Sequence, residues 1–379
     1  MRIGLDIRVI YDHFPGIGRY LYNLVAAMGA LPQRDPAHTL VLISNPDLPN
    51  TRYNLAALAQ PPQIELVQTR LRPFSLAEQH GLPRLAHQIK LDLLHSPYYV
   101  KPYIGIPCPS IVSIYDLIGR RYPATLSPRS RYLYRTLMGW AVRSAAHIIT
   151  ISASARDDLR AYYRLRPEQI TVVYGAADAH FQPQPQPIVD DLRHRYQLPP
   201  RYVLYLGSNK PHKNLPRLVR AWERVLAEYP TTDAVLVLAG HTDPRYPEAR
   251  HMVAERNLSE RVQFIPDVAE ADLPALYSGA EVFVFPSFYE GFGLPPLEAM
   301  ACGAPVLCAY ASSLPEVVGD AALTFDPYSF LEIAEHLQLV LHNPSLRQQL
   351  RARSLQQARR FSWAQAAAAT WAVYLRYAR

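Results

Sequence analysis

The chain has 379 residues, of which 49% are hydrophobic and 19% charged, with a formal net charge of +7. This composition excludes a disordered chain, and the length exceeds what one ordinary core needs, so two globular domains are expected. No apolar run approaches the roughly 20 residues of a membrane-spanning helix. The three cysteines, Cys108, Cys302 and Cys308, lack metal-binding spacing and indicate buried thiols in a reducing compartment.

The first half of the chain alternates short β-branched runs with longer helical segments, which is typical of parallel sheets covered by helices. Strands are predicted at residues 2–8, 39–44, 63–67, 91–95, 110–115, 147–151 and 170–174. Helices are predicted at residues 19–30, 75–88, 128–145 and 153–164. The N-terminus enters the first strand without a charged lead and an apolar core, so we expect no secretion signal and a cytoplasmic protein.

The segment from Leu117 to Arg143 is basic and aromatic. It contains six arginines and no acidic residue, interleaved with tyrosines and Trp140. Such a segment can lie on the inner face of an anionic membrane or hold a phosphorylated acceptor. The alternative is a solvated helix face with some of its aromatic side chains in the core. No nucleic-acid partner is expected.

The segment Phe181–Pro187 alternates proline with other residues, which favours an extended connector and marks the domain junction. After this connector the alternation of strands and helices begins again. Strands are predicted at residues 202–207, 234–240, 262–265, 281–285 and 305–308, and helices at 215–228, 273–278 and 295–301. Ser313 with Glu316 predicts a capping box, residues 329–379 are wholly helical, and Ser362 can cap the last helix.

The pattern as a whole predicts an α/β protein with two Rossmann-like, doubly wound domains. We assign residues 1–180 to an N-terminal domain, 181–194 to a linker and 195–361 to a C-terminal domain. The C-terminal helix, 362–379, is expected to pack back on the N-terminal domain. Ligands in such sheets bind at the carboxyl ends of the strands, which should face a central cleft.

The most informative segment is the loop from Glu290 to Leu294, between an apolar strand and a helix. Gly291 and Gly293 let the backbone approach a ligand, and the following helix start offers unpaired N–H groups to an anion. Glu298 adds a second carboxylate. A ligand with phosphate and hydroxyl groups, such as a nucleotide sugar, fits this pattern. The alternative is that Glu298 complements the helix dipole and Glu290 caps the loop.

Three further segments follow strands and contain polar residues. One of these segments places Lys210, His212 and Lys213 at a helix start, where the helix dipole disfavours cations. Their presence there is explained if a bound diphosphate neutralises them. The alternative is a basic surface turn. The Gly16-Ile17-Gly18 segment lacks the third glycine of a dinucleotide fingerprint and is more plausible as a loop lining a cleft. Candidate acceptor-side residues at strand ends of the first domain are Gly18, His95, Tyr115 and Asp116, and a structural histidine is the alternative for His95.

No Asp-x-Asp pair and no His/Cys cluster with metal-ligand spacing occurs in the chain, so neither a metal nor another cofactor is expected.

Taken together, these residues resemble glycosyltransferase family 4, whose members have the GT-B fold. The most specific part is the pair Glu290 and Glu298, eight positions apart, followed by Ala-Met-Ala-Cys-Gly-Ala-Pro-Val. Gly207 with Lys213-Asn214, and the Ser-Ser-Leu-Pro-Glu-Val-Val segment that begins at Ser312, also match. The resemblance implies a retaining, metal-independent enzyme that moves a sugar from a nucleotide diphosphate donor to an acceptor hydroxyl.

The resemblance also implies residue roles. Glu290 would hold the hydroxyls of the donor sugar, Glu298 the ribose, and Lys213 the diphosphate, so that Glu290 and Lys213 are the catalytic candidates. Donor contacts are further expected from the amides around Gly291, Phe292, Gly293 and Leu294, from Val268 near the nucleobase, and from Gly16. Two positions depart from the family pattern: Ser208 stands where an arginine is frequent, and Tyr115 where a histidine is frequent. The positive charge that this arginine would offer to the donor phosphates would then come from His212 or Lys210.

The leading hypothesis is a hexosyltransferase of glycan, polysaccharide or glycolipid synthesis, with GDP-mannose as the first donor guess. UDP-glucose and related donors remain open, and the acceptor is a glycan or a lipid-linked molecule. Alternatives are a catalytically weakened nucleotide-sugar-binding scaffold, an epimerase or hydrolase on the same fold and, most weakly, an NAD oxidoreductase.

Overall fold

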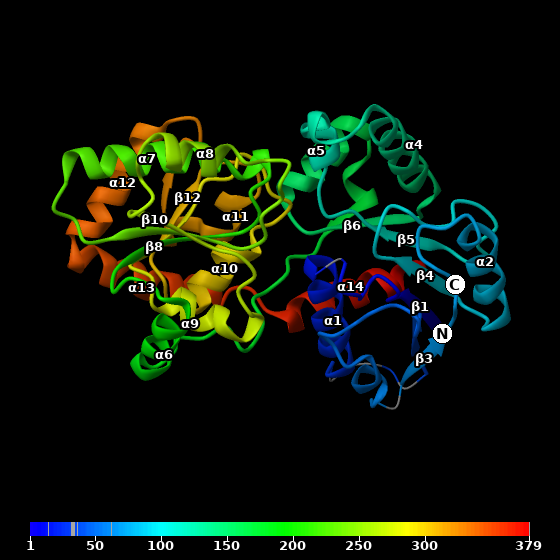
Figure 1. Ribbon diagram of the computed structural model, residues 1–379. Coiled ribbons are helices and arrows are strands. Elements are labelled where there is room, and N and C mark those ends of the chain that lie inside the picture. Colours follow the sequence, from blue (N-terminus) through cyan, green and yellow to red (C-terminus); the bar gives the residue numbers. More distant parts are fainter. Residues whose placement is uncertain (14, 32–34, 36, 62, 379) are drawn as a thin grey trace. The chain divides into compact units, whose positions relative to one another are not determined.

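The computed structural model describes residues 1–13, 15–31, 35, 37–61 and 63–378. The chain divides into two compact units: unit 1 comprises Met1–Gly175 and Ser362–Arg379, and unit 2 comprises Ala176–Phe361 (Figure 1). Each unit is built on a parallel sheet covered by helices, which confirms the predicted α/β class with two doubly wound halves. The C-terminal helix, α14 (Trp363–Tyr377), belongs to unit 1 and packs beside α1 (Pro15–Gly29).

The sheet of unit 1 has seven parallel strands in the order β3-β2-β1-β4-β5-β6-β7. All seven are at the predicted places, with ends that shift by a few residues: β1 (Arg2–Asp6), β2 (Thr39–Ser44), β3 (Ile64–Gln68), β4 (Leu93–Ser96), β5 (Ser110–Ser113), β6 (His147–Thr150) and β7 (Ile170–Val172). Besides α1 and α14, the helices of this unit are α2 (Glu78–Gln88), α3 (Ile118–Arg121), α4 (Pro128–Ser144) and α5 (Ala153–Tyr163).

Alternation along the strands of unit 1 separates two faces of the sheet, because successive side chains of a strand point to opposite sides. Leu40 and Leu42 pack with residues of α1 and α14. Their neighbours Val41 and Ile43 pack on the other side with residues of α2. The inner strands β1, β2, β4, β5 and β6 are buried on both faces, as expected for a parallel sheet between two helix layers, whereas the edge strand β3 has exposed residues.

The sheet of unit 2 has six parallel strands in the order β10-β9-β8-β11-β12-β13. They are β8 (Tyr202–Leu206), β9 (Val235–Ala239), β10 (Val262–Ile265), β11 (Val282–Phe285), β12 (Val306–Ala309) and β13 (Leu323–Phe325). The first five were predicted. The sixth was missed because a three-residue strand at the sheet edge has too short a pattern to recognise.

The helices of unit 2 form two layers. They are α6 (Gln186–Tyr196), α7 (Leu215–Glu228), α8 (Glu248–Glu255), α9 (Leu273–Ser278), α10 (Leu294–Ala301), α11 (Leu314–Val318), α12 (Phe330–His342) and α13 (Pro344–Ala358). On one face of the sheet α7 contacts α8 and α12, and on the other α10 contacts α9 and α13 (Figure 1). The prediction of an extended connector as far as Pro187 was wrong at its end. The helix α6 already begins at Gln186, because a proline in the first turn has no helical N–H to lose.

In both sheets the strand order reverses once, between β1 and β4 in unit 1 and between β8 and β11 in unit 2. Ligands of open α/β sheets bind outside the carboxyl ends of the strands at such a reversal. The loops that follow β8 and β11 in unit 2 are the ones that contain Lys213 and Glu290.

Candidate active site

The loop after β11 leads from a fully buried strand into α10. The strand contributes Phe283 and Phe285 to the core of unit 2, and the chain then turns towards the helix at Gly293. Gly293 has φ of +125°, which L-residues rarely adopt, and a Cβ there would lie 3.0 Å from Leu314 Cδ2. The backbone conformation therefore favours glycine at this position, and a larger residue would also make a tight contact with the Leu314 side chain.

The start of α10 presents backbone donors without protein acceptors. Within the described residues, no hydrogen bond uses the N–H groups of Gly291, Gly293 or Leu294. The next two residues, Pro295 and Pro296, have no N–H group. The partial positive charge of a helix start adds to these donors, so this loop is suited to an anion.

Glu290, at the beginning of this loop, forms an ion pair with Lys213. The distance from Lys213 Nζ to Glu290 Oε1 is 2.7 Å, and the two side chains are only 14% and 11% exposed. The Lys213 ammonium also lies over the Phe285 ring, 5.1 Å from its centroid. The pair brings together the two residues that the sequence singled out as catalytic candidates.

Lys213 is held by a short turn between β8 and α7. It ends a 3₁₀ turn, Pro211–Lys213, and the next residue, Asn214, has the left-handed conformation with φ of +64°. The Asn214 side-chain amide donates to the carbonyl oxygens of Pro286 at 3.0 Å and Pro327 at 2.8 Å. Asn214 thus fastens the Lys213 turn to the end of β11.

His212, predicted as a source of positive charge for the phosphates, is buried in the turn before α7. The side chain is buried, and burial lowers its pKa to about 4, so the imidazole is neutral at pH 7. Its carbonyl oxygen accepts a hydrogen bond from Phe288 N at 2.8 Å, which joins this turn to the loop after β11. Lys210 is exposed and remains the candidate for an additional cation.

Glu298 is the fifth residue of α10 and is buried. The hydroxyl of Tyr277, on α9, donates a hydrogen bond to Glu298 Oε2 at 3.0 Å. A carboxylate at this depth needs hydrogen-bond donors, and Tyr277 provides one from the protein. The same donor fixes the orientation of the carboxylate towards any ligand hydroxyl.

The remaining donor-side candidates lie at the carboxyl ends of neighbouring strands. Ser208 follows β8, and its carbonyl oxygen accepts a hydrogen bond from the Tyr205 hydroxyl at 2.8 Å. Val268 follows β10 and packs partly buried against the core of unit 2. Both therefore lie on the strand-end side of this unit, as the resemblance implies.

In unit 1 the structure corrects the interpretation of the two glycines near the N-terminus. Gly16 and Gly18 lie in the first turn of α1 rather than in a loop. A Cβ at Gly16 would meet no atom within 4 Å, and one at Gly18 would make ordinary contacts. The helix starts earlier than predicted because Pro15 is compatible with a first turn.

His95 was predicted as an acceptor-side residue, but its placement is that of a core histidine. It is buried, its Nδ1 lies 2.7 Å from the Tyr374 hydroxyl and its Nε2 lies 2.8 Å from Ser113 Oγ. Both ring nitrogens are thus engaged, and burial lowers the pKa to about 3. The alternative of a structural histidine fits this geometry.

Tyr115 and Asp116, the other acceptor-side candidates, follow β5 and are half-buried. The ring of Tyr115 packs edge-on against Tyr20, with centroids 5.5 Å apart. Asp116 Oδ1 accepts a hydrogen bond from the backbone N–H of Ile118 at 2.8 Å. Asp116 remains a candidate for contacts with acceptor hydroxyls.

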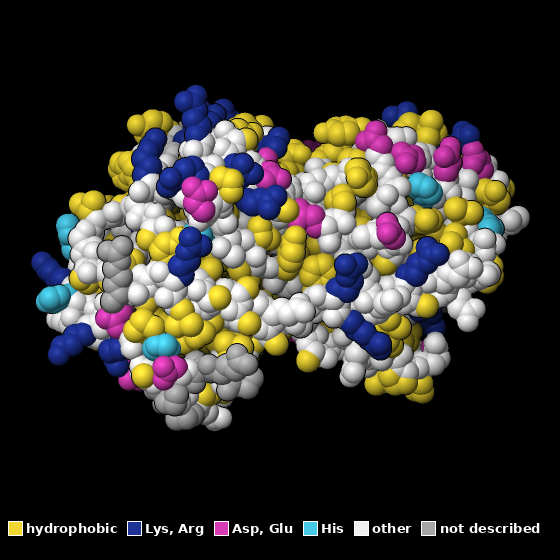
Figure 2. All heavy atoms as spheres, turned by 180° about the vertical axis from the view of Figure 1, so that it is seen from behind, with side chains coloured by type: hydrophobic (Ala, Val, Ile, Leu, Met, Phe, Trp, Pro, Cys, Tyr) yellow, Lys and Arg dark blue, Asp and Glu magenta, His cyan; other side chains and the backbone are white. Residues whose placement is uncertain are grey.

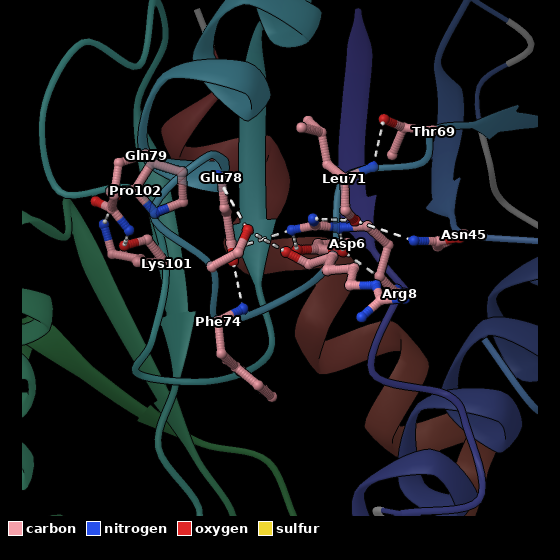
Figure 3. Close-up of polar contacts among 12 residues, drawn as sticks. Asp6, Arg8, Asn45, Thr69, Leu71, Phe74, Glu78, Gln79, Lys101 and Pro102 are labelled. Atoms are coloured by element: carbon pink, nitrogen blue, oxygen red, sulfur yellow. Dashed lines mark hydrogen bonds and ion pairs between the residues drawn. The ribbon is translucent and has the colours of Figure 1, made fainter. Parts of the chain in front are cut away.

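Sequence reasoning missed a buried charge cluster at the carboxyl end of β1. The Arg8 guanidinium forms ion pairs with Asp6 at 2.7 Å and Glu78 at 3.0 Å, and Arg8 also donates to the carbonyl oxygen of Leu71 at 3.0 Å (Figure 3). The other carboxylate oxygen of Glu78 accepts from Phe74 N. The cluster fastens the loop between β3 and α2 to β1. In the sequence, this cluster is indicated only by Asp6 and Arg8, which lie two positions apart at the end of a predicted strand.

The basic segment forms α4 and the short elements before it. On α4, Tyr132, Leu133 and Trp140 are 75%, 55% and 51% exposed, and Arg129 and Arg135 are exposed as well. Figure 2 shows Lys and Arg side chains, with hydrophobic side chains between them, over the part of unit 1 where α4 and α5 lie. Tyr134 packs against a core cluster of unit 1, so some of the aromatic side chains join the core while Tyr132 and Trp140 are exposed.

Two features are absent from the part of the chain that the structure describes. No group of three or more His, Cys, Asp and Glu side chains is arranged to hold a metal ion. No helix combines the length and the apolar character that crossing a membrane requires.

Solved structures with similar folds support the architecture. A sucrose-phosphate synthase from Thermosynechococcus elongatus superimposes with a TM-score of 0.75 at 22% identity, covering 99% of this chain and 98% of that one. A protein from Anabaena solved with UDP and glucose superimposes with a TM-score of 0.74 at 19% identity, covering 99% of both chains. Both show the GT-B arrangement of two Rossmann-like domains as the fold class of this chain.

Sequence relatives point to the same family. An O-antigen chain mannosyltransferase B of Escherichia coli is 35% identical over 240 residues, and a serotype-specific mannosyltransferase WbdA of the same organism is 31% identical over 299 residues. These alignments cover 62% and 75% of this chain, but they span only 61% and 36% of the relatives' lengths. Residues 15–181 match the family described as Glycosyltransferase Family 4, and residues 191–357 match Glycosyl transferases group 1. Because these matches run through both units, the chain belongs to glycosyltransferase family 4.

Proposed function

We propose that the protein is a retaining, metal-independent glycosyltransferase, and that GDP-mannose is its donor. The observation that carries the proposal is the Lys213–Glu290 pair beside the unpaired N–H groups at the start of α10. A cation, bare amides and a carboxylate at one strand-end edge suit a ligand with a diphosphate and a sugar. The names of the relatives, mannosyltransferases of O-antigen chains, support mannose as the transferred sugar.

In this mechanism the acceptor hydroxyl attacks the anomeric carbon from the face that the phosphate leaves. The new glycosidic C–O bond forms as the bond to the phosphate oxygen breaks, and the acceptor proton passes to that oxygen. Lys213 and the amides of the α10 loop stabilise the charge that develops on the diphosphate. Preorganised donors of this kind are each worth about 2.7–4 kcal/mol where measured in other enzymes.

Glu290 has two roles in this mechanism, one for each oxygen of its carboxylate. Its free oxygen positions hydroxyls of the donor sugar, while the oxygen bonded to Lys213 keeps the ammonium in place at 2.7 Å. Glu298, oriented by Tyr277, holds the ribose hydroxyls. Binding of both ends of the donor leaves the scissile bond between them.

A thermal-shift panel tests the donor assignment. GDP, UDP, ADP and their sugar conjugates are added without metal and again with Mg²⁺, because a ligand that binds only the folded state raises its stability. A shift with GDP and GDP-mannose, unchanged by Mg²⁺ or EDTA, is expected. A shift with another nucleotide, or one that needs Mg²⁺, would contradict this part of the proposal.

Turnover separates transfer from the alternatives. Transfer to a mannoside acceptor with retained α-configuration is expected by NMR. Binding without transfer would indicate a scaffold, release of free sugar a hydrolase, and conversion of the donor sugar an epimerase.

We also propose that α4 contacts an anionic membrane surface, on which a lipid-linked acceptor would lie. Exposed aromatic and aliphatic side chains next to Arg129 and Arg135 combine apolar insertion with electrostatic attraction. Co-sedimentation with phosphatidylglycerol vesicles is expected, and phosphatidylcholine vesicles should bind much less. Arg129→Gln/Arg135→Gln should weaken binding, whereas Arg256→Gln, a partly exposed arginine of unit 2, should not.

A further inference from the structure

We propose that Ser312 and Ser313, in the loop after β12, are positioning residues for the Glu290 carboxylate. This inference rests on the proposed function, because it takes Glu290 as the group that contacts the transferred sugar. The two serines hold the backbone of Glu290 rather than its carboxylate.

Both serine hydroxyls are engaged with the backbone of the donor loop. Ser312 Oγ accepts a hydrogen bond from Glu290 N at 2.8 Å and donates to the Glu290 carbonyl oxygen at 3.2 Å. Ser313 Oγ lies 2.9 Å from the same carbonyl oxygen and 2.6 Å from that of Phe292, so its single proton serves both. The backbone from Glu290 to Phe292 is thereby fixed at its two ends.

Ser313 makes these contacts instead of capping a helix. It is the N-cap residue of α11, and a serine there normally accepts a hydrogen bond from the helix backbone. No side-chain cap forms, and the capping box predicted from Ser313 and Glu316 is wrong for this reason. The fully buried Ser313 hydroxyl is used on the donor loop in preference to its own helix.

Ser312 has an unfavourable backbone conformation. Its φ is +47°, in the left-handed region that non-glycine residues occupy at a cost. Glycine would suit this conformation, but it could not make the two contacts to Glu290. The contribution of Ser312 is therefore its hydroxyl, which forms two hydrogen bonds with the Glu290 backbone.

The consequence concerns the geometry of catalysis. Lys213 holds the Glu290 carboxylate from one side, and the two serines hold its backbone from the other. A displacement of about 1 Å in a catalytic group can cost 100-fold in rate. Loss of a serine hydroxyl should therefore lower kcat by about 10- to 100-fold while the donor KM changes by less than about 3-fold.

The experiment compares Ser312→Gly and Ser313→Ala with Ser354→Ala. Ser312→Gly removes the hydroxyl but relieves the strained φ, so that part of the stability lost with the two hydrogen bonds is regained and the variant should remain folded. Ser354 is a matched control, since it is fully buried on α13 and its Oγ has no hydrogen-bond partner among the described residues. Steady-state kinetics with the sugar nucleotide that the wild type uses, and thermal unfolding, are measured for each variant.

A double-mutant cycle with Glu290→Gln distinguishes positioning from general structural support. If the serines act through Glu290, Ser313→Ala should cause little further loss of kcat in the Glu290→Gln background. Losses that multiply in the double variant, or an unchanged kcat in a folded Ser312→Gly protein, would overturn the inference while leaving the proposed function intact. Absence of wild-type turnover with every sugar nucleotide would instead contradict the proposed function, and this inference with it.

Discussion

The ammonium of Lys213 and the carboxylate of Glu290 meet at 2.7 Å, although 77 residues separate them in the chain. They come from the loops after β8 and β11, which are neighbouring strands at the point where the order of the sheet reverses. A buried ion pair is weak evidence for stability, since desolvation offsets much of the attraction. Its place at this edge of the sheet is better explained by a ligand that engages both groups.

Lys213→Ala should lower kcat by about 100- to 1000-fold and change donor affinity much less, because the ammonium stabilises charge that develops only in the transition state. Arg256→Ala is the control, because Arg256 is a partly exposed cation at the end of α8 that has no assigned role in the site. Steady-state kinetics and direct measurement of donor binding provide the comparison. Equal losses of rate and affinity would show that Lys213 binds the ground state just as strongly.

Tyr277→Phe should weaken binding of the nucleoside diphosphate by about 3- to 10-fold, since a single hydrogen bond contributes about 0.5–1.5 kcal/mol. The reason is that Glu298 loses the donor that orients it. Calorimetry should show a smaller effect with the 2′-deoxy ligand if Glu298 binds the ribose. Tyr202→Phe removes another buried hydroxyl, bonded to Leu276 O at 2.7 Å, and should leave nucleotide affinity unchanged.

The stability of the protein should rise with pH between about 4 and 6.5, in part because of His212. Burial holds its folded-state pKa at about 4, while an unfolded histidine titrates near 6.5, so the unfolded chain binds more protons in this window. Above about pH 7 this contribution is constant. Urea unfolding from pH 4.5 to 8 should show a shallower pH slope for His212→Gln. An identical slope would mean that the pKa of His212 is the same in the folded and the unfolded protein.

Arg8→Met should destabilise the protein by about 3–5 kcal/mol, because it leaves the Asp6 and Glu78 carboxylates buried without their cation. The double variant Arg8→Met/Glu78→Leu should recover part of this loss. The control is Arg2→Met, whose partly exposed pair with Glu65 should contribute only about 0–1 kcal/mol. Denaturant unfolding measures all three variants, and similar losses for Arg8 and Arg2 would contradict the role assigned to the cluster.

Most of the fold was predictable because its signals are local. Runs such as Thr39–Ser44 and Val262–Ile265 are rich in β-branched residues and bounded by turn residues, and their predicted bounds agree with the structure. The helix Leu215–Glu228 was predicted from the alternation of strand and helix segments, with the same bounds. Ser362 caps the last helix as expected, accepting from Gln365 N at 3.2 Å. These elements depend on the order of neighbouring residues, which a sequence displays directly.

The wrong predictions concern residues whose side chains could form alternative hydrogen bonds or adopt alternative protonation states. The Ser313 hydroxyl could cap α11 or bond to carbonyl oxygens of the donor loop, and only the packed structure brings those oxygens within 2.9 Å. His212 stands beside two lysines in sequence, yet burial keeps it neutral. His95 sits at a strand end, but Tyr374, distant in the chain, occupies one of its ring nitrogens.

The sequence by itself determined the two doubly wound halves and the identity of Glu290, Glu298 and Lys213 as the residues of interest, because strand and helix periodicity and glycine-spaced loops are local patterns. Only the tertiary structure decided which ionisable side chains are charged and which residues distant in the chain come into contact. Burial sets whether His212 can be a cation, and the parallel pairing of β11 with β8 and β12 brings Glu290 to Lys213 and to the two serines. Desolvation and contacts between distant segments depend on the packed chain, and no short stretch of sequence contains them.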